Sequence, residues 1–342
     1  MNRTWYYNNK ELKVVNSFVY LGVLLHYNGR FQQTQKRLAE QGGRALASLF
    51  CTLKSICISK SQQCSMFDSL VASILNYASE IWGFHQGKDI EVIHNKFCRF
   101  VLNVPKNTPV CGVIGELGHL PMYIIRKQRL LKYWVNIVTN KPNLVFNIYQ
   151  LLLNDCNNGK ENWATNVRKL LYDLGLNYVW DEQNNIMINY NVLKVRLLDQ
   201  FYQNWRSSIE NSEKLSIYKV IKSDFKMEEY LLKDFSVQFL TLIRLGVLKL
   251  NIETGRYVNQ PRNNRVCLCC NLKNIENEYH FLLVCPAYRQ YRIKYLPRYY
   301  HSWPHIHKLY TLLQATNSVL LKNVICYIRE CWKIRTFITN GR

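Results

Sequence analysis

Residues 266–288 read VCLCCNLKNIENEYHFLLVCPAY, a stretch that spaces three cysteines and one histidine as zinc sites do. Two residues separate Cys267 from Cys270, nine more precede His280, and another four precede Cys285. Three thiolates and one imidazole complete a tetrahedral shell around Zn²⁺, and a shell of four protein ligands is structural. The stretch therefore predicts a CCHC zinc knuckle. Cys269 is a competing ligand that we expect to point away, and the alternative is a set of reduced, buried cysteines.

The chain is strongly basic. Its 342 residues include 45 Lys and Arg against 23 Asp and Glu, which gives a formal net charge of +22. Such an excess favours a polyanionic partner, most simply nucleic acid, and the interleaved Tyr and Trp side chains offer flat surfaces on which bases can stack. Part of the excess has another explanation, because AT-rich codons produce abundant Asn, Lys, Ile and Tyr without selection for binding. The charge supports nucleic-acid binding without establishing it.

The composition is that of a globular protein. Apolar residues make up 48% of the chain, enough for a substantial core without disulfides. The first residues, MNRTWYYNNKE, lack the apolar stretch of a secretory signal, and the cysteines outside residues 266–288 are scattered singly. We therefore expect reduced cysteines and an intracellular protein, nuclear and/or cytoplasmic. No apolar run approaches the ~20 residues that span a bilayer, so we expect no membrane partner.

The apolar pattern predicts a mainly α protein with a short N-terminal β-hairpin region. Residues 1–30 alternate apolar and polar side chains and contain turn signals at Asn8-Asn9 and Asn28-Gly29. Helical spacing begins at Phe31 and then dominates the chain. The predicted helices cover residues 31–54, 61–84, 89–102, 121–139, 144–153, 163–173, 190–210, 215–221, 234–245 and 320–337.

The best internal linker candidate is residues 154–160, NDCNNGK, because this stretch is short, polar and contains a glycine. We therefore place a domain boundary near residue 158. The predicted organisation is a hairpin region at 1–30, helical domains at 31–157 and 158–260, the zinc knuckle at 261–295, and a C-terminal helical segment at 296–342.

Catalytic motifs are missing from the sequence. Two-metal phosphoryl or nucleotidyl transfer needs carboxylates within a few ångström of one another, and the sequence contains no such cluster. The adjacent acids Asp181-Glu182 and Glu228-Glu229 fall in segments with the pattern of solvated loops or helix faces. The sequence also contains no P-loop, no GxSxG elbow and no glycine-rich dinucleotide turn. We expect no catalysis by the chain alone.

Five stretches together resemble one known family. They are FVYLG at 18–22, LNYASEIWG at 75–83, ELGHLP at 116–121, IETGRY at 252–257, and HFLLVCPAY at 280–288, which precedes Arg289 and Arg292. In this order they resemble the C-terminal region, from thumb to cysteine-rich zinc knuckle, of non-LTR (LINE-like) retrotransposon reverse transcriptases. The resemblance spans nearly the whole chain. His119 departs from it, because relatives are expected to carry Arg after Glu-Leu-Gly.

The resemblance implies specific roles. Residues 1–30 would be primer-grip-like, with Phe18, Tyr20, Leu21 and Gly22 in the gripping hairpin, and residues 31–157 would be thumb-like. The carboxylates of the polymerase palm would precede Met1, and residues after Cys285 lack the pattern of a restriction-like endonuclease. The resemblance therefore implies a noncatalytic fragment of a retrotransposon polyprotein whose parent family is RNA-directed DNA polymerase. Alternatives are a polymerase component whose palm is supplied in trans or in a longer parent chain, and a zinc-stabilised protein-interaction scaffold.

The expected partners are RNA and an RNA/DNA duplex or target DNA, while the oligomeric state stays open. Contacts are expected from cations that recur at helical spacing, because such spacing can leave one face of a helix basic while the apolar residues face the core. The alternative for any one helix is that its basic face is exposed to solvent and binds no nucleic acid. The predicted contact residues are Lys36, Arg37, Arg44, Lys96, Arg99, Arg126, Lys127, Arg129 and Lys132.

Overall fold

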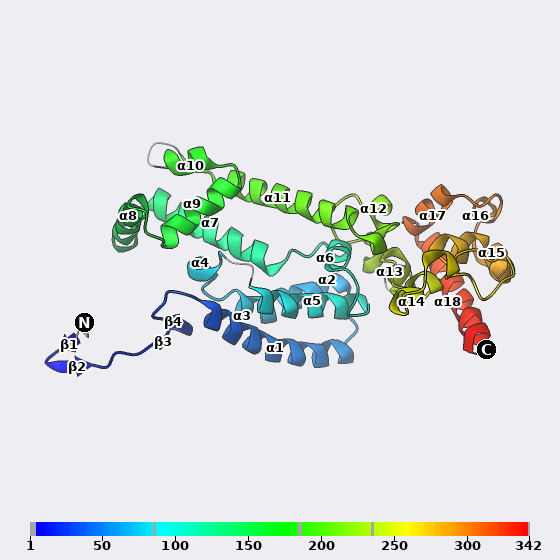
Figure 1. The fold of residues 1–342 in the computed structure, drawn as a ribbon, viewed down its shortest axis with the longest axis horizontal. Helices are drawn as coiled ribbons and strands as arrows, with labels where there is room; N and C mark the ends of the chain where they lie inside the picture. Colours follow the sequence, from blue (N-terminus) through cyan, green and yellow to red (C-terminus); the bar gives the residue numbers. More distant parts are fainter. Residues whose placement is uncertain (1–4, 85–86, 184–186, 234–235, 341–342) are drawn as a thin grey trace. The chain divides into compact units, whose positions relative to one another are not determined.

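The computed structural model confirms a mainly helical protein with two short hairpins at its N-terminus (Figure 1). It describes residues 5–84, 87–183, 187–233 and 236–340. Among these residues, no helix combines the length and the apolar composition needed to cross a membrane.

The chain forms two compact units, each built from separate stretches of sequence. Unit 1 comprises residues 1–56, 65–94 and 120–201, and unit 2 comprises residues 57–64, 95–119 and 202–342. Residues 120–201 form one continuous part of unit 1, so the predicted domain boundary near residue 158 lies inside that unit. The polar stretch at 154–160 is in part helical, because α8 (Asn143–Asn157) continues through its first four residues.

The two hairpins lie within the predicted region, residues 1–30, but their strands show no regular alternation of buried and exposed residues. Strand β1 (Trp5–Tyr7) pairs antiparallel with β2 (Lys10–Leu12), and β3 (Ser17–Tyr20) pairs with β4 (Val23–His26). Each turn has two residues, and both residues of each turn have positive φ, as type I′ turns require: 48° and 60° at Asn8-Asn9, 45° and 83° at Leu21-Gly22.

Unit 1 packs its helices around apolar stripes of the expected period. Every fourth position of α7 (Met122–Asn140) from Met122 to Val138 is buried, and Trp134 stacks on Trp180 with ring centres 6.2 Å apart. The predicted bounds match α9 (Trp163–Asp173) and agree within one residue with α1 (Gln32–Ser55) and α7, while α8 ends four residues beyond its predicted end. The unit also contains α3 (Ser73–Leu75), α4 (Ser79–Trp82) and α10 (Asn177–Asp181), and no helix was predicted at α10.

The predicted continuous helix over residues 61–84 is wrong. Helix α2 (Lys60–Phe67) leads into a π-helical turn, Asp68–Ala72, and then into α3, after which the chain turns and restarts as α4. The break falls at Ala78, whose φ of 51° is left-handed and cannot belong to an α-helix.

Unit 2 contains a helix that the sequence analysis did not predict, α6 (Val110–Leu117). Its two glycines, Gly112 and Gly115, disfavour a helix in isolation. Both are needed for packing, because a Cβ at Gly115 would lie 2.6 Å from the Trp205 ring and one at Gly112 would lie 2.9 Å from Leu245. The close packing of α6 against its neighbours therefore outweighs the low helix propensity of its two glycines.

The remaining helices of unit 2 are mostly short. The predicted helix over 215–221 is divided into a 3₁₀ turn, Glu213–Leu215, and α12 (Tyr218–Ile221), and residues 234–235 of the next predicted helix lie outside the described residues. The others are α13 (Gln238–Arg244), α14 (Asn251–Tyr257), α15 (Arg289–Tyr295), α16 (Arg298–His301), α17 (Ile306–Leu313) and α18 (Ser318–Asn340), with 3₁₀ turns at Glu229–Leu232, Arg262–Asn264 and Pro286–Tyr288. Helices α2, α5 (Lys88–Leu102) and α11 (Tyr190–Glu210) contain residues of both units.

Candidate metal centre

A short β-type turn presents the first two predicted ligands. Val266 and Ile275 form an antiparallel bridge, and the Cys267 amide donates to the Asn274 carbonyl over 2.8 Å. Lys273 in the turn between them has a φ of 53°. The turn therefore holds Cys267 and Cys270 on a short loop with a fixed base.

The other two predicted ligands lie at the ends of a single π-helical turn, His280–Val284, followed by Cys285. The Asn277 side chain accepts from the His280 amide over 2.8 Å and caps the turn. The Cys285 amide donates back to the His280 carbonyl over 2.8 Å. This wider turn brings the ring of His280 and the thiol of Cys285 toward the same point, although five positions separate them.

The four ligand atoms form the shell that a tetrahedral metal requires. Cys267 Sγ lies 3.9 Å from Cys285 Sγ, Cys270 Sγ lies 3.4 Å from His280 Nε2, and all four atoms are within 4.8 Å of one another. For metal bonds of about 2.3 Å to sulfur and about 2.0 Å to nitrogen, tetrahedral geometry puts two sulfurs about 3.8 Å apart and a sulfur and a nitrogen about 3.5 Å apart. The observed separations fit a metal such as zinc.

Burial and protonation suit the same role. Cys267, His280 and Cys285 are buried, and Cys270 is half-buried. Burial lowers the pKa of His280, which favours the neutral imidazole that binds metals. The pKa of Cys267 is raised to about 12, because a lowering hydrogen bond with Cys269 is outweighed by the hydrogen bond with Cys285 and by burial. A bound metal would displace these thiol protons.

Cys269 does not point away from the site, contrary to the prediction. Its thiol lies within 4.8 Å of Cys267 and of a Glu276 carboxylate oxygen, although it is not part of the four-ligand cluster. A hydrogen bond with Cys267, together with burial, raises the pKa of the Cys269 thiol. Cys269 therefore contacts one ligand from outside the shell.

Side chains from α15 and α18 hold the knuckle in place. Arg335 of α18 makes two 2.7 Å contacts with Glu276, which also accepts from the Asn251 amide over 2.7 Å. Arg292 of α15 donates to the Leu282 and Cys285 carbonyls, each over 2.9 Å. The sequence analysis missed the contacts of Glu276 because Arg335 and Asn251 lie 59 and 25 positions away. Arg292 lies only 10 and 7 positions from its two acceptors, and the sequence analysis named it without assigning these contacts.

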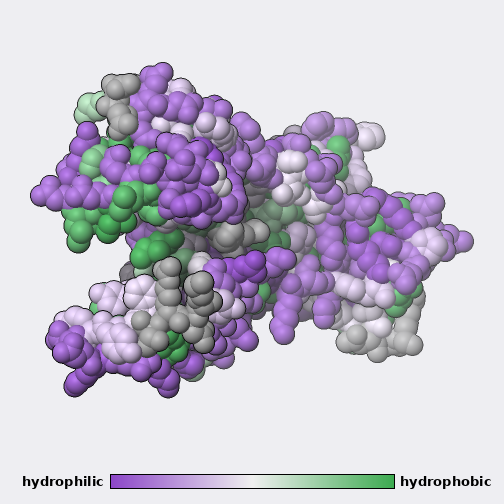
Figure 2. All heavy atoms as spheres, turned by 60° about the vertical axis from the view of Figure 1, so that its left-hand side comes forward, coloured by the Kyte–Doolittle hydropathy of each residue, from purple (hydrophilic) through white to green (hydrophobic). Residues whose placement is uncertain are grey.

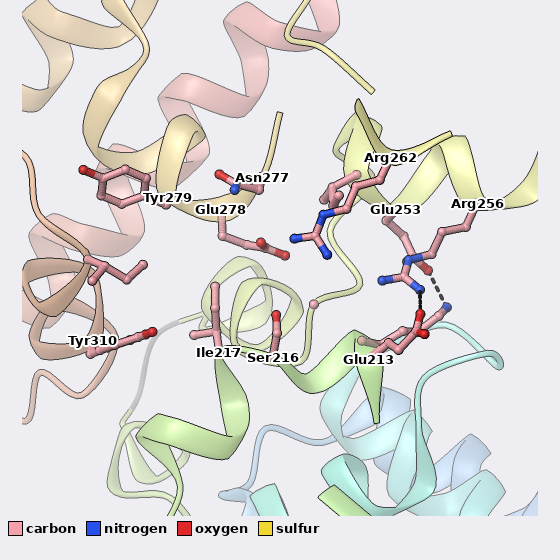
Figure 3. Close-up of a pocket in the computed structure, with 14 residues that line it drawn as sticks. Glu213, Ser216, Ile217, Glu253, Arg256, Arg262, Asn277, Glu278, Tyr279 and Tyr310 are labelled. Carbon is pink, nitrogen blue, oxygen red and sulfur yellow. Dashed lines mark hydrogen bonds and ion pairs between the residues drawn. The ribbon is translucent and has the colours of Figure 1, made fainter. Parts of the chain in front are cut away.

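A pocket of about 170 Å³ lies beside the knuckle in unit 2 (Figure 3). Asn277, Glu278 and Tyr279, which lead into His280, line one wall, and Figure 3 shows Glu278 and Arg262 pointing toward one another. Burial raises the pKa of Glu278. The remaining lining includes Glu253 and Arg256, so the pocket carries charges of both signs and does not select an anion.

One predicted nucleic-acid contact, Arg126, is buried in unit 1. Its exposed fraction is 0%, and its guanidinium contacts Glu91 Oε1 over 3.1 Å and the side chain of Asn76. Glu91 also accepts from the amides of Met122 and Tyr123, at 3.2 and 2.7 Å. The prediction that Arg126 belongs to an exposed basic face is wrong, because this charge neutralises a carboxylate inside the unit.

The other predicted contacts are distributed between the two units. Lys36, Arg37 and Arg44 are exposed on α1, and Lys132 is exposed on α7. The half-buried side chains of α7 have local contacts: Arg129 donates to the Asn76 carbonyl over 3.0 Å, and Lys127 lies 6.0 Å from the Tyr123 ring. In unit 2, Lys96 is exposed, and Arg99 donates to the Thr108 carbonyl over 3.1 Å.

The predicted primer-grip-like residues form the β3–β4 hairpin of unit 1. Phe18, Tyr20 and Leu21 are exposed. Tyr77, from the LNYASEIWG stretch, donates its hydroxyl to the Leu21 carbonyl over 2.7 Å, and a Cβ at Gly22 would lie 3.3 Å from the Tyr77 ring. Two of the stretches that carry the family resemblance therefore pack against each other.

The sequence and the fold were compared with known proteins. Neither family models nor curated proteins nor solved structures gave a match to this chain.

Proposed function

We propose that this protein is a noncatalytic nucleic-acid-binding module that contacts the phosphate backbone of RNA, an RNA/DNA duplex or target DNA. The observation that carries the proposal is the position of its charges. Cations outnumber acids by 22, and Lys36, Arg37 and Arg44 recur on the exposed side of a single helix, α1. One exposed acid, Glu40, lies among these three cations, so they remain in excess on this side of α1. Clustered exposed cations favour a polyanion by releasing its counterions.

Four acids are paired with cations of the same unit, and each of these acids is buried or half-buried. Because each pair is neutral, the remaining charged residues keep the net excess of 22 cations, and cations make up a larger share of them. The pairs are Glu91 with Arg126, Glu116 with Arg244, Glu253 with Lys214, and Glu276 with Arg335, at 2.6 to 3.1 Å. Polar side chains dominate the face drawn in Figure 2, with apolar side chains in patches.

Zinc is the metal we propose for Cys267, Cys270, His280 and Cys285. Three thiolates with one imidazole in a closed shell suit Zn²⁺, which here would join the two halves of the knuckle without taking part in a reaction. The resemblance of the five sequence stretches further supports descent from the C-terminal region of a non-LTR retrotransposon reverse transcriptase.

A protein-interaction scaffold is the second candidate function, and one observation favours it. Leu144, Ile148 and Leu151 form an exposed apolar stripe along α8. Such a stripe is typical of a helix that docks against another protein.

The test of the proposed function is the salt dependence of binding to an RNA/DNA duplex. For the zinc-loaded chain, log affinity is expected to fall linearly with log salt, with a slope of about 0.9 for each phosphate neutralised on B-form DNA. The triple variant Lys36→Ala, Arg37→Ala, Arg44→Ala should bind more weakly and with a flatter slope.

The matched control removes three exposed cations that already have a carboxylate partner, by Lys160→Ala, Lys169→Ala and Lys226→Ala. This control should retain most of the affinity and slope. Equal losses in both triple variants would show a response to net charge only, and unchanged binding by the α1 variant would remove α1 from the interface.

A further inference from the structure

The stretch from residue 279 to 329 in unit 2 contains no Asp or Glu. It follows the acid Glu278 and ends before Glu330. Within it the chain forms the end of the knuckle, α15, α16, α17 and the start of α18 (Figure 1). The cations of this acid-free stretch are Arg289, Arg292, Lys294, Arg298, Lys308, Lys322 and Arg329.

Trp303, between α16 and α17, is the most exposed tryptophan side chain that the structure describes, at 88%. Its φ of 52° is left-handed, which is rare for a bulky residue and costs energy. Neither burial nor backbone preference accounts for a large aromatic ring at this position. Tyr299, four residues earlier, is also exposed, at 55%.

The loop that carries Trp303 is held from both sides. The Ser302 amide and hydroxyl both donate to the Arg298 carbonyl, over 3.0 and 2.7 Å. Lys308 donates to the Ser302 carbonyl over 2.7 Å while its ammonium lies 4.5 Å from the centre of the Tyr299 ring. On the far side, His305 caps α17 by accepting from the His307 amide. The exposed ring therefore projects from a loop with a defined conformation.

Exposed cations precede this loop in the sequence, and Lys308 contacts it. Arg289 and Lys294 are exposed on α15, Arg298 is exposed at the start of α16, and Lys308 lies on α17. Backbone geometry limits the Cα atoms of Tyr299 and Trp303 to at most about 14 Å apart. The two rings are therefore close enough to stack on bases of the same short strand.

We propose that the segment from α15 to α17 binds single-stranded nucleic acid, with Trp303 and Tyr299 stacking on unpaired bases and Arg298, Lys294 and Arg289 contacting phosphates. A duplex keeps its bases stacked on one another, so an exposed ring selects single strands, whereas cations alone do not discriminate. This inference deepens the proposed function and rests on it. It adds a site that lies outside the residues expected to contact the duplex backbone.

The test uses the full zinc-loaded chain with fluorescently labelled twelve-nucleotide oligo(U), oligo(dT) and an RNA/DNA duplex. Trp303→Ala should weaken binding of the single strands about tenfold and leave duplex affinity unchanged, while Trp303→Phe should retain most single-strand binding because it keeps a ring. The matched control is Tyr178→Ala, which removes another exposed aromatic ring, on α10, and should change neither affinity. Circular dichroism and zinc content verify that each variant is folded.

The outcomes separate this site from the proposed function. If Trp303→Ala binds the single strands as tightly as the unchanged chain does, and duplex binding persists, the proposed single-strand site is overturned and the proposed function is not. Absence of binding to all three probes at low salt would overturn both. A preference for oligo(U) over oligo(dT), lost in Trp303→Ala, would assign RNA to the site, and equal affinities would assign single strands of either kind. Binding of phosphatidylserine vesicles that requires Trp303, with unchanged oligonucleotide binding, would assign the surface to a membrane instead and overturn the proposal.

Discussion

Arg244 Nε lies 2.6 Å from Glu116 Oε1, and both side chains are buried in unit 2. Arg244 also contacts Glu228 over 2.7 Å, and Glu228 is paired with Lys222. Burial alone would lower the pKa of Arg244, but its carboxylate neighbours outweigh this effect and raise it. The glutamate of the ELGHLP stretch therefore has a structural partner, which connects α6 to α13.

Arg244→Met should strongly destabilise unit 2. The substitution keeps an unbranched apolar stem but leaves Glu116 buried without its counter-charge, and loss of one partner of a buried pair costs about 3 to 5 kcal/mol. Urea unfolding followed by circular dichroism measures the change. Lys226→Met, at an exposed pair with Asp224, is the control and should change stability little. Similar effects of the two substitutions would contradict the assigned role of Arg244.

Arg126→Met should destabilise unit 1 in a pH-dependent manner. Burial already raises the pKa of Glu91, and removal of the Arg126 charge, which opposes this shift, should raise it further. A carboxyl group whose pKa is higher in the folded than in the unfolded state binds more protons when folded, so stability falls as pH rises through that range. The variant should therefore lose least stability at acid pH and most near neutral pH. Urea midpoints at several pH values test this, and a pH-independent difference from the unchanged chain would contradict it.

Cys270→Ser should remove the metal from the knuckle. Apparent zinc binding energies of such sites are about 10 to 16 kcal/mol, so the metal contributes folding energy and chelation should unfold the knuckle locally. Metal analysis of purified protein and hydrogen exchange over residues 266–288 provide the readouts. Cys269→Ser, adjacent in sequence but outside the four-ligand cluster, is the matched control and should retain zinc. Retention of zinc by Cys270→Ser, or its loss only from Cys269→Ser, would contradict the ligand assignment.

Tyr77→Phe should loosen the β3–β4 hairpin without disturbing the rest of unit 1. The lost hydroxyl is the donor to the Leu21 carbonyl, and such a hydrogen bond contributes about 1 kcal/mol. Gly22→Ala should have a similar or larger effect, because it places a side chain at a φ of 83° beside the Tyr77 ring. Faster amide exchange over residues 17–26 would be the measurement. Unchanged exchange in both variants would mean that Tyr77 does not hold the turn.

The sequence predicted the cluster of Cys267, Cys270, His280 and Cys285, which could bind a metal such as zinc, because these residues lie close together in the chain. The helices α9 and α11 were also predicted at their observed bounds, since each carries a regular apolar period. The prediction failed for Arg126, although a signal was available. Arg126 occupies the same i+4 row as Met122 and Leu130, which are buried, so its position on the helix indicated the core and its charge suggested the surface.

Contacts between distant residues explain the other failures. The break at Ala78 has no local signal, and the adjacent Tyr77 has its partner at Leu21, 56 residues earlier. The helix α6 depends on packing that only the folded unit provides, because its glycines are unfavourable in isolation. The spacing of apolar residues within one segment contains no information about partners elsewhere in the chain.

The discontinuity of unit 2 constrains how the chain can fold as it is synthesised. Residues 57–64 and 95–119 leave the ribosome well before residues 202–342, and Glu116 precedes Arg244 by 128 positions. Until Arg244 emerges, α6 has an uncompensated carboxylate beside apolar residues, Val113 and Leu117, that the finished unit buries. A nascent chain stalled before Arg244 would expose apolar surface of the kind that chaperones bind. Residues 202–342 must therefore be synthesised before the earlier segments of unit 2 are protected from aggregation.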